Sequence, residues 1–187
     1  MRLLRLLSLI IFLLTACSPP TPEQVESPNT PTTTNKAAQK SKAREAVEEI
    51  PLHPVLRIVD GDTIWVEIEN EEAKIRLLGI DTPELERDLT PVECYAEEAE
   101  DRLRALLAGK GVMLLKSKTG DEVDRYGRLL RYVFADGEDV SARLIREGYA
   151  FAFRRYAHDR RSHYVQLEAE AQAAQVGMWD AQNCSYW

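Results

Sequence analysis

Two short segments in which apolar and polar residues alternate constrain the fold more than any other feature of this sequence. In residues 64–69 every second side chain is apolar, and residues 73–77 repeat the pattern. Successive side chains of a strand point to opposite faces, so both segments are predicted to be half-buried strands. A third strand is expected at residues 55–59. The short connections, Asp60-Gly61 and residues 69–72, are typical of hairpins, which predicts an antiparallel meander of three strands.

The rest of the chain changes period. Residues 95–108 place apolar side chains at helical spacing and end at glycines, which predicts a helix. Beyond it we expect two more strands, a short helix that Gly148 closes and a last helix that ends near Gly177, at residues 112–115, 129–134, about 140–145 and 164–174. Five strands with a helix after the third are typical of a small closed barrel of the OB type. The predicted fold class is therefore α+β, a five-stranded OB-type barrel with three packed helices.

The amino terminus has the pattern of an export signal. A basic start is followed by a mostly apolar run over residues 6–14, which is too short to span a membrane. Residues 14–17, Leu-Thr-Ala-Cys, resemble a bacterial lipobox. That resemblance implies a signal peptide at residues 1–16 and a lipid on Cys17. The alternative is an ordinary signal peptide with a chance cysteine.

Residues 17–50 contain almost no large apolar side chain and are rich in Pro, Thr, Ser, Gln, Lys and Glu. Such a segment cannot bury enough surface to offset its chain entropy, so we expect a disordered tether. The expected product is an exported bacterial lipoprotein, held on a membrane by Cys17 and facing the periplasm or the cell surface, with one domain at residues 51–187. In an oxidising compartment the two remaining cysteines, Cys94 and Cys184, are expected to form a disulfide.

Three stretches of the domain carry the residues that suit chemistry. They are Asp60-Gly61-Asp62-Thr63, residues 76–84 and residues 124–128. Each alone is readily explained as a turn. Together they offer acids for a hard metal ion, a spare carboxylate for a base and two arginines for a phosphate, which is the set that phosphodiester hydrolysis needs.

The spacing within the second stretch makes a structural demand. Arg76 and Asp81 are separated by an odd number of residues, so an unbroken strand would place them on opposite faces. Gly79 lies between them and is expected to bend the chain so that both side chains reach one site.

These stretches resemble the signature of the staphylococcal nuclease family, and the likeness extends over residues 53–180. The resemblance implies a catalytic trio of Arg76, Glu84 and Arg128. It implies one Ca²⁺ held by Asp62, Asp81 and the Thr82 carbonyl, with Asp60 as a supporting acid. The residues expected to contact the bound nucleotide are Arg125, Tyr126, Arg154 and Tyr156.

The implied activity is Ca²⁺-dependent hydrolysis of DNA and RNA by a monomer, with little sequence specificity and with 3′-phosphate ends as products. One alternative is a non-catalytic module on the same barrel that binds nucleic acid or protein, although such modules typically lose the catalytic acids and arginines. The other is a structural lipoprotein of the envelope, which leaves the charged residues unexplained.

Two features depart from the family pattern. Arg154 stands where one of two pocket tyrosines is expected, so Phe151, Phe153 or Tyr156 are candidates for its replacement. The chain is also acidic, with a net charge of −7, whereas proteins that bind polyanions usually present a basic face. The candidate patch combines four arginines with two tyrosines: Arg154, Arg155, Arg160, Arg161, Tyr156 and Tyr164. Its alternative interpretation is a solvated loop and helix start.

Overall fold

The first three strands form the predicted meander, because their alternating side chains bury one face. They are β1 (His53–Asp60), β2 (Thr63–Ile68) and β3 (Glu71–Leu77), and both pairs are antiparallel. Ile64 and Ile75, which are register partners, are fully buried, while Trp65, the next residue after Ile64 on β2, belongs to the opposite face.

The sheet closes through a parallel pairing. β5 (Gly111–Leu115) is antiparallel to both β1 and β6 (Leu129–Ala135), and β6 runs parallel to β3 with Ile75 opposite Leu129. We call this pairing of β3 with β6 the seam. The strand order β3-β2-β1-β5-β6 with the seam gives a closed five-stranded mixed barrel, which confirms the predicted fold class.

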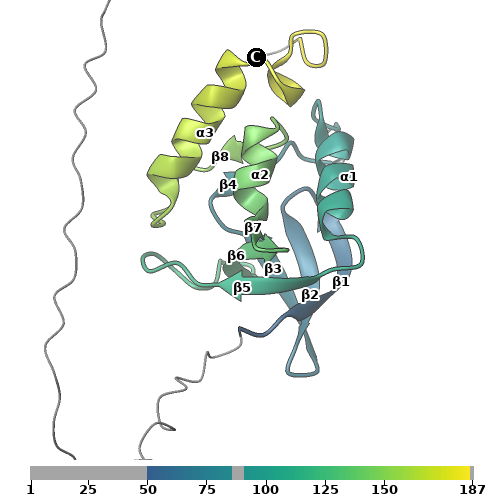
Figure 1. Cartoon of the computed structure of the whole chain (residues 1–187), viewed down its shortest axis with the longest axis vertical. Coiled ribbons are helices and arrows are strands. Elements are labelled where there is room, and N and C mark those ends of the chain that lie inside the picture. Colours follow the sequence, from purple (N-terminus) through teal and green to yellow (C-terminus); the bar gives the residue numbers. More distant parts are fainter. Residues whose placement is uncertain (1–49, 86–90, 186–187) are drawn as a thin grey trace, which may run out of the picture. The chain divides into compact units, whose positions relative to one another are not determined.

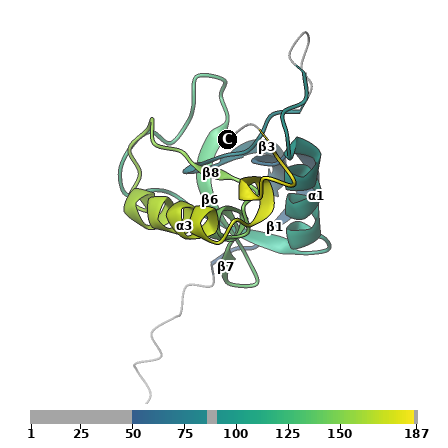
Figure 2. The ribbon, with the colours of Figure 1, turned by 90° about the horizontal axis from the view of Figure 1, so that it is seen from above.

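Three helices pack on the barrel, as predicted. They are α1 (Ala96–Leu107), α2 (Val140–Arg146) and α3 (Arg161–Ala173). Figure 1 shows the helices gathered on one side of the strands, and Figure 2 shows α1 and α3 at opposite edges of the fold. α2 lies between them and contacts both. Buried residues of all three helices, including Leu103, Leu144 and Tyr164, belong to one hydrophobic core with the inner face of the barrel.

Four very short elements complete the described fold. They are β4 (Ile80–Asp81), β7 (Glu138–Asp139), β8 (Phe151–Ala152) and the 3₁₀ turn η1 (Gly177–Trp179). β4 and β8 pair with each other, and the Phe153 N–H donates to the Gly79 carbonyl at 2.9 Å. This pairing carries residues 153–156 to the end of β3.

The bend expected at Gly79 is present. Gly79 has a φ of +84°, which is the left-handed region that glycine adopts without steric cost. A Cβ at this position would lie 2.5 Å from His158 and 2.8 Å from Tyr164. The bend separates β3 from β4 and turns Asp81 towards Arg76, which confirms the inference from their spacing.

A disulfide joins the two cysteines of the domain. Cys94 lies just before α1 and Cys184 lies after η1, with 5.9 Å between their Cα atoms. The bridge therefore ties the end of the chain to the segment that leads from Glu84 into α1.

The computed structural model describes residues 50–85 and 91–185, which belong to one unit, Val47–Trp187. The predictions for the signal peptide, for Cys17 and for residues 17–49 of the tether lie outside the described residues. No helix within the described part has the length and apolar character needed to cross a membrane.

Candidate active site

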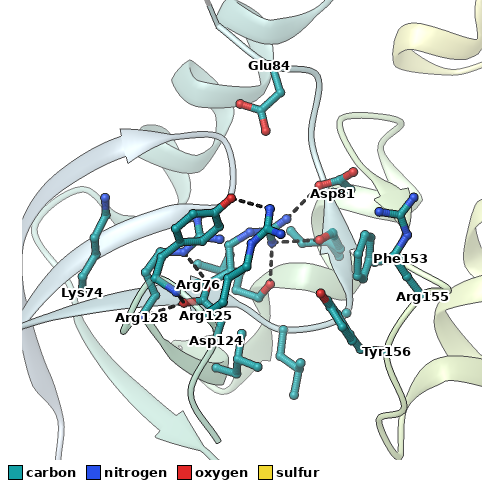
Figure 3. A pocket seen from close by; sticks show the side chains of 16 residues that line it. Lys74, Arg76, Asp81, Glu84, Asp124, Arg125, Arg128, Phe153, Arg155 and Tyr156 are labelled. Atoms are coloured by element: carbon teal, nitrogen blue, oxygen red, sulfur yellow. Dashed lines mark hydrogen bonds and ion pairs between the residues drawn. The ribbon is translucent and has the colours of Figure 1, made fainter. Parts of the chain in front are cut away.

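A cavity of about 520 Å³ is lined by two of the three charged stretches, residues 76–84 and 124–128, and by residues 153–156. One wall is formed by β3 and the segment that follows it as far as Glu84. The second is the connection into β6, from Asp124 to Leu130, and the third is residues 153–156. Figure 3 shows the arginine side chains and the Glu84 carboxylate converging on this space. We call it the cavity below.

Arg76 connects the backbone on both sides of the Gly79 bend to two carboxylates at the cavity. Its guanidinium donates to the carbonyls of Leu77 and Ile80 on either side of the Gly79 bend, at 2.9 and 2.8 Å. One of its nitrogens lies 2.7 Å from Asp62 Oδ2 and 2.8 Å from Asp81 Oδ1. Arg76 therefore neutralises charge and also fixes the geometry of the bend that brings Asp81 into the site.

A buried hydroxyl links the acids to the second arginine. Thr63 Oγ1 donates to Asp62 Oδ1 at 2.9 Å and accepts from Arg128 at 3.3 Å. Asp60 lies beside them, and its carboxylate accepts from the Asp62 N–H at 3.2 Å. The Asp60–Thr63 turn thus connects both arginines, one through Asp62 and one through Thr63.

Asp124 sets the position of Arg128. Its Oδ1 accepts from the backbone N–H groups of Tyr126 and Arg128, both at 2.9 Å, and its Oδ2 accepts from Arg128 Nε at 2.6 Å. Burial favours a higher pKa for Asp124, but the hydrogen bonds from Arg128 and Tyr126 outweigh it and hold the pKa below its usual range. Asp124 therefore stays ionised and keeps the Arg128 guanidinium directed across the seam.

Burial shapes the charge of the carboxylates near Arg76. It raises the pKa of Asp62 to about 7, with Arg76 acting in the opposite direction and Asp60 adding to the rise. Burial also raises the pKa of Asp81, again against Arg76. Carboxylates whose charge is only partly offset gain stability from another positive charge nearby. This electrostatic setting suits a bound cation.

Two neighbouring carboxylates, Asp62 and Asp81, are the candidate ligands of a hard cation. Asp62 and Asp81 share one Arg76 nitrogen, and the Thr82 N–H donates to Asp62 Oδ2 at 3.3 Å. Within residues 50–85 and 91–185, no three His, Cys, Asp or Glu side chains come together as a metal site. Ca²⁺ accepts carboxylate, carbonyl and water oxygens, so a cation here would complete its shell with water and substrate oxygens.

Glu84 reaches the cavity from the segment after β4. Its carboxylate points into the cavity from the side of Asp81, as Figure 3 shows. The backbone at Glu84 is clipped to Glu93, because the Glu93 N–H donates to the Glu84 carbonyl at 2.9 Å and the Glu84 N–H donates to the Glu93 carboxylate at 3.0 Å. Glu93 precedes Cys94, so the disulfide holds the base of this segment.

The domain that carries this site matches known proteins over most of its length. Residues 74–181 match the family model described as Staphylococcal nuclease homologue. The thermonuclease of Staphylococcus hyicus is 35% identical over 145 residues, which cover 77% of this chain and 82% of that protein. The chain belongs to the staphylococcal nuclease family.

Other relatives of this nuclease family carry related names. Endonuclease YncB of Bacillus subtilis is 35% identical over 127 residues, covering 66% of this chain and 59% of that protein. A protein of Escherichia coli O157:H7 named as an uncharacterized endonuclease is 36% identical over 135 residues, covering 71% of this chain and 80% of its own. At the level of the family, the chain is a hydrolase of the endonuclease type.

Not every residue expected to contact the nucleotide lines the cavity. Arg125 and Tyr126 do, with the Arg125 guanidinium 4.6 Å from the centre of the Tyr126 ring, and so does Tyr156. Arg154 is absent from the lining because it pairs with the buried Glu168 of α3 and donates to the Ala152 carbonyl. Arg155 lines the cavity instead.

Two of the three candidates for the missing pocket tyrosine are in place. Phe153 and Tyr156 line the cavity with their ring centroids 5.4 Å apart. Phe151, on β8, instead packs edge-on against Trp179, with 5.3 Å between the ring centroids. Phe153 and Tyr156 therefore provide the aromatic surface on this wall of the nuclease cavity, and Tyr126 lies on the wall from Asp124 to Leu130.

The expected basic patch does not form a single surface. Arg160 pairs with Asp139 at the start of α2 and lies over the Tyr132 ring at 4.6 Å, while Tyr164 is fully buried. Of the patch residues, only Arg155 and Tyr156 line the cavity. For most of residues 154–164, the alternative interpretation as a loop and helix start is therefore the one that fits the structure.

Sequence reasoning gave no role to three residues of the site, Thr63, Lys74 and Asp124, and it named Arg155 only as part of the candidate basic patch. Thr63 and Asp124 lie inside the charged stretches. The role of Thr63 as a link between Asp62 and Arg128 appears only when two stretches meet in space, whereas Asp124 positions Arg128 within its own stretch. Lys74 had a usable signal, because it lies two residues before Arg76 on the same face of β3.

Proposed function

We propose that this chain hydrolyses phosphodiester bonds of DNA and RNA in a Ca²⁺-dependent reaction with little sequence specificity. The products carry 3′-phosphate ends, and the domain acts as a monomer. The observation that carries the proposal is the meeting of Arg76 and Arg128 across the seam, joined through Asp62 and Thr63, with Glu84 facing them across the cavity. Arg76 is on β3 and Arg128 immediately precedes β6, so the pairing of these two strands brings the arginines to one cavity.

The two arginines have the task of binding and stabilising phosphate. A guanidinium presents paired donors to two phosphate oxygens, and two guanidiniums favour the more highly charged pentacovalent transition state over the ground state. Arg128, which Asp124 holds in place, is assigned to the leaving 5′ oxygen. Glu84 is assigned to orient the attacking water and to accept its proton.

Asp62, Asp81 and the Thr82 carbonyl would hold the Ca²⁺ ion, with Asp60 supporting Asp62. When bound, Ca²⁺ polarises the phosphate and offsets its negative charge. The raised pKa values of Asp62 and Asp81 support this assignment. In a chain with a net charge of −7, a bound cation also supplies attraction for the polyanionic substrate that the overall charge does not.

The experiment is digestion of plasmid DNA and of RNA by the full chain, with Ca²⁺ and with a chelator. We expect cleavage only with Ca²⁺. Glu84→Gln and Arg128→Ala should each lower kcat by about 10²- to 10⁴-fold, since each removes a group that acts in the transition state. The 3′ ends should resist extension by a polymerase until a phosphatase has treated them.

The matched control is Glu97→Gln, which removes an exposed carboxylate from the first turn of α1, outside the cavity. It should retain the activity of the original chain. Activity that survives the chelator, or that persists in Glu84→Gln and Arg128→Ala, would contradict the mechanism. Ca²⁺-dependent binding without cleavage would instead support the non-catalytic module.

We propose further that residues 1–16 are a signal peptide and that Cys17 carries lipid, which would tether the nuclease to a membrane of a bacterium. The support is the lipobox pattern at residues 14–17. Expression with a radiolabelled fatty acid should label the chain, and Cys17→Ser should remove the label and release the protein from the membrane fraction. Membrane retention of unlabelled Cys17→Ser would overturn the assignment.

A further inference from the structure

A row of three side chains crosses the outer face of the meander next to the cavity. Arg57 on β1 is the register partner of Trp65 on β2, and Trp65 is the register partner of Lys74 on β3. Because side chains alternate along strands, the partners Thr63 and Arg76 belong to the same face one row away. We call Arg57, Trp65 and Lys74 the outer row.

The outer row is an aromatic ring between two cations. The Arg57 guanidinium lies 4.2 Å from the centre of the Trp65 ring, and Lys74 Nζ lies 6.0 Å from it. Arg57 also donates to Glu72 at 3.0 Å, but both of these side chains are about half exposed. Exposed ion pairs contribute little stability, so this pair is readily exchanged for a phosphate.

The outer row continues the surface of the catalytic site. Lys74 lines the cavity together with Arg76, and Figure 3 shows it at the edge of the cavity next to Arg128. Two residues along a strand span roughly 6.6 Å, so the outer row lies about one nucleotide step from the row of Arg76. A nucleic-acid strand whose scissile phosphate is bound by Arg76 and Arg128 therefore places its neighbouring nucleotide at Lys74 and Trp65.

The next row of side chains limits the nucleotide-binding surface to one nucleotide beyond the catalytic arginines. Glu67 and Glu72 are register partners one row further along β2 and β3, on the same face. Two carboxylates side by side repel a polyanion. The face of the meander thus changes from cationic at Arg76 and Lys74 to acidic at Glu67, with the outer row between.

We propose that the outer row is a binding platform for the nucleotide adjacent to the scissile phosphate, in a single-stranded segment of the substrate. Its unstacked base lies against the Trp65–Arg57 pair, and its phosphate pairs with Lys74. Aromatic rings and guanidinium planes stack with any base, which suits binding without sequence preference. The proposal rests on the proposed function, because it takes the substrate to be nucleic acid with its scissile phosphate at Arg76 and Arg128.

The test compares two substrates and three variants of the full chain. A single-stranded oligonucleotide of about twelve nucleotides covers the platform, whereas the nitrophenyl ester of a mononucleotide has no neighbouring nucleotide to reach it. For Trp65→Ala, the ratio of kcat/KM for the oligonucleotide to that for the ester should fall roughly tenfold, with a smaller fall for Trp65→Phe. Arg146→Gln removes one exposed cation outside the cavity and should keep the ratio of the original chain.

Binding without cleavage separates this proposal from the proposed function. The anisotropy of a labelled oligonucleotide, measured with a chelator at several salt concentrations, gives affinity and its salt dependence. Lys74→Gln should lower the slope of log affinity against log salt by about 0.7, because one contact with a single strand is lost, and Arg146→Gln should not. Trp65→Ala should weaken binding about tenfold with little change of slope.

Each outcome decides one question. Ca²⁺-dependent cleavage combined with unchanged substrate ratios and salt slopes in the Trp65 and Lys74 variants overturns the platform and keeps the proposed function. Absence of cleavage combined with oligonucleotide binding that depends on Trp65 and Lys74 overturns the catalytic proposal and keeps the platform. Melting temperatures of Trp65→Phe and Lys74→Gln close to that of the original chain exclude unfolding as the cause.

Discussion

At Gly79 one backbone conformation decides the geometry of the site. The bend it permits lets Arg76 contact the Leu77 and Ile80 carbonyls and Asp81 at once. The same glycine faces the rings of His158 and Tyr164, so the bend is also a packing point for the segment that precedes α3. A change at Gly79 therefore reaches the catalytic acids and the core together.

Gly79→Ala should lower the free energy of unfolding by at least about 2 kcal/mol, from a left-handed backbone and from collision with two rings. Gly137→Ala is the matched control, since Gly137 has a φ of +79° and a Cβ added there would meet nothing within 4 Å. It should cost only about 1 kcal/mol. Denaturant unfolding measures both, and equal losses would show that the contacts with His158 and Tyr164 do not matter.

At the scale of elements, the length of each strand or helix determined whether it could be predicted from the sequence. The strands near residues 55–77 and the helix at residues 96–107 are long enough to show their periods, and they were predicted within a few residues. β4 and β8 have two residues each, which is too short for any alternation. Their pairing places Arg155 and Phe153 at the cavity, and without it the sequence could offer these two residues only as candidates. Arg154, which was expected to contact the nucleotide, pairs with Glu168 in the structure.

The charged residues near Arg76 were predictable for a different reason. The stretches that contain them have more acidic residues than a turn requires, and these residues are Asp60, Asp62, Asp81 and Glu84. In addition, the odd spacing of Arg76 and Asp81 required a bend, which the structure has at Gly79. The connection through Thr63 depends on a contact with Arg128 across the seam, between residues far apart in the chain. Such contacts leave no local pattern in a sequence.

The disulfide makes an element-scale prediction. Cys94→Ser/Cys184→Ser should lower the free energy of unfolding by about 2–4 kcal/mol, because the bridge spans a sequence separation of 90 residues and restricts the unfolded chain. The double substitution should also lower kcat, because Cys94 follows Glu93, and Glu93 makes the two hydrogen bonds that hold the backbone of Glu84. Thermal unfolding and plasmid digestion measure the two effects.

A reductant provides the control for this prediction. It should reproduce both losses in the original chain and change nothing in the double variant. A double variant that melts earlier but keeps full kcat would show that the clip at Glu93 positions Glu84 without help from the bridge.

At the scale of the whole molecule, one polar cluster ties the barrel to the segments on both sides of it. Asp159, just before α3, accepts from Ser117 Oγ at 2.6 Å and from the Tyr132 hydroxyl at 2.8 Å. Ser117 follows β5 and Tyr132 is buried in β6. The hydrogen bond from Ser117, followed by that from Tyr132, lowers the pKa of Asp159 to about 2.

This cluster predicts how stability depends on pH. The folded pKa of Asp159 is below the unfolded value near 3.8, so its contribution is complete above about pH 4 and is lost as the pH falls to about 2. Asp159→Asn should therefore cost about 1 kcal/mol at pH 6, a figure reduced for solvent exposure, and almost nothing at pH 2. Urea unfolding at a series of pH values tests this.

Asp121→Asn removes an exposed carboxylate from the connection between β5 and β6, which also contains Ser117, and serves as the control. The difference in unfolding free energy between Asp159→Asn and the original chain should shrink with falling pH, and the control should not follow that course. A constant difference for Asp159→Asn would mean that its hydrogen bonds do not depend on the charge of the carboxylate.

The seam has a consequence for a chain that is still being synthesised. The meander is complete at Leu77, but the parallel partner of β3 begins only at Leu129, after a crossover that includes α1 and β5. A nascent chain therefore displays Arg76 and the acids for some fifty residues before Arg128 exists to join them. The proposed chemistry therefore cannot begin until Arg128 and the strand that follows it have left the ribosome.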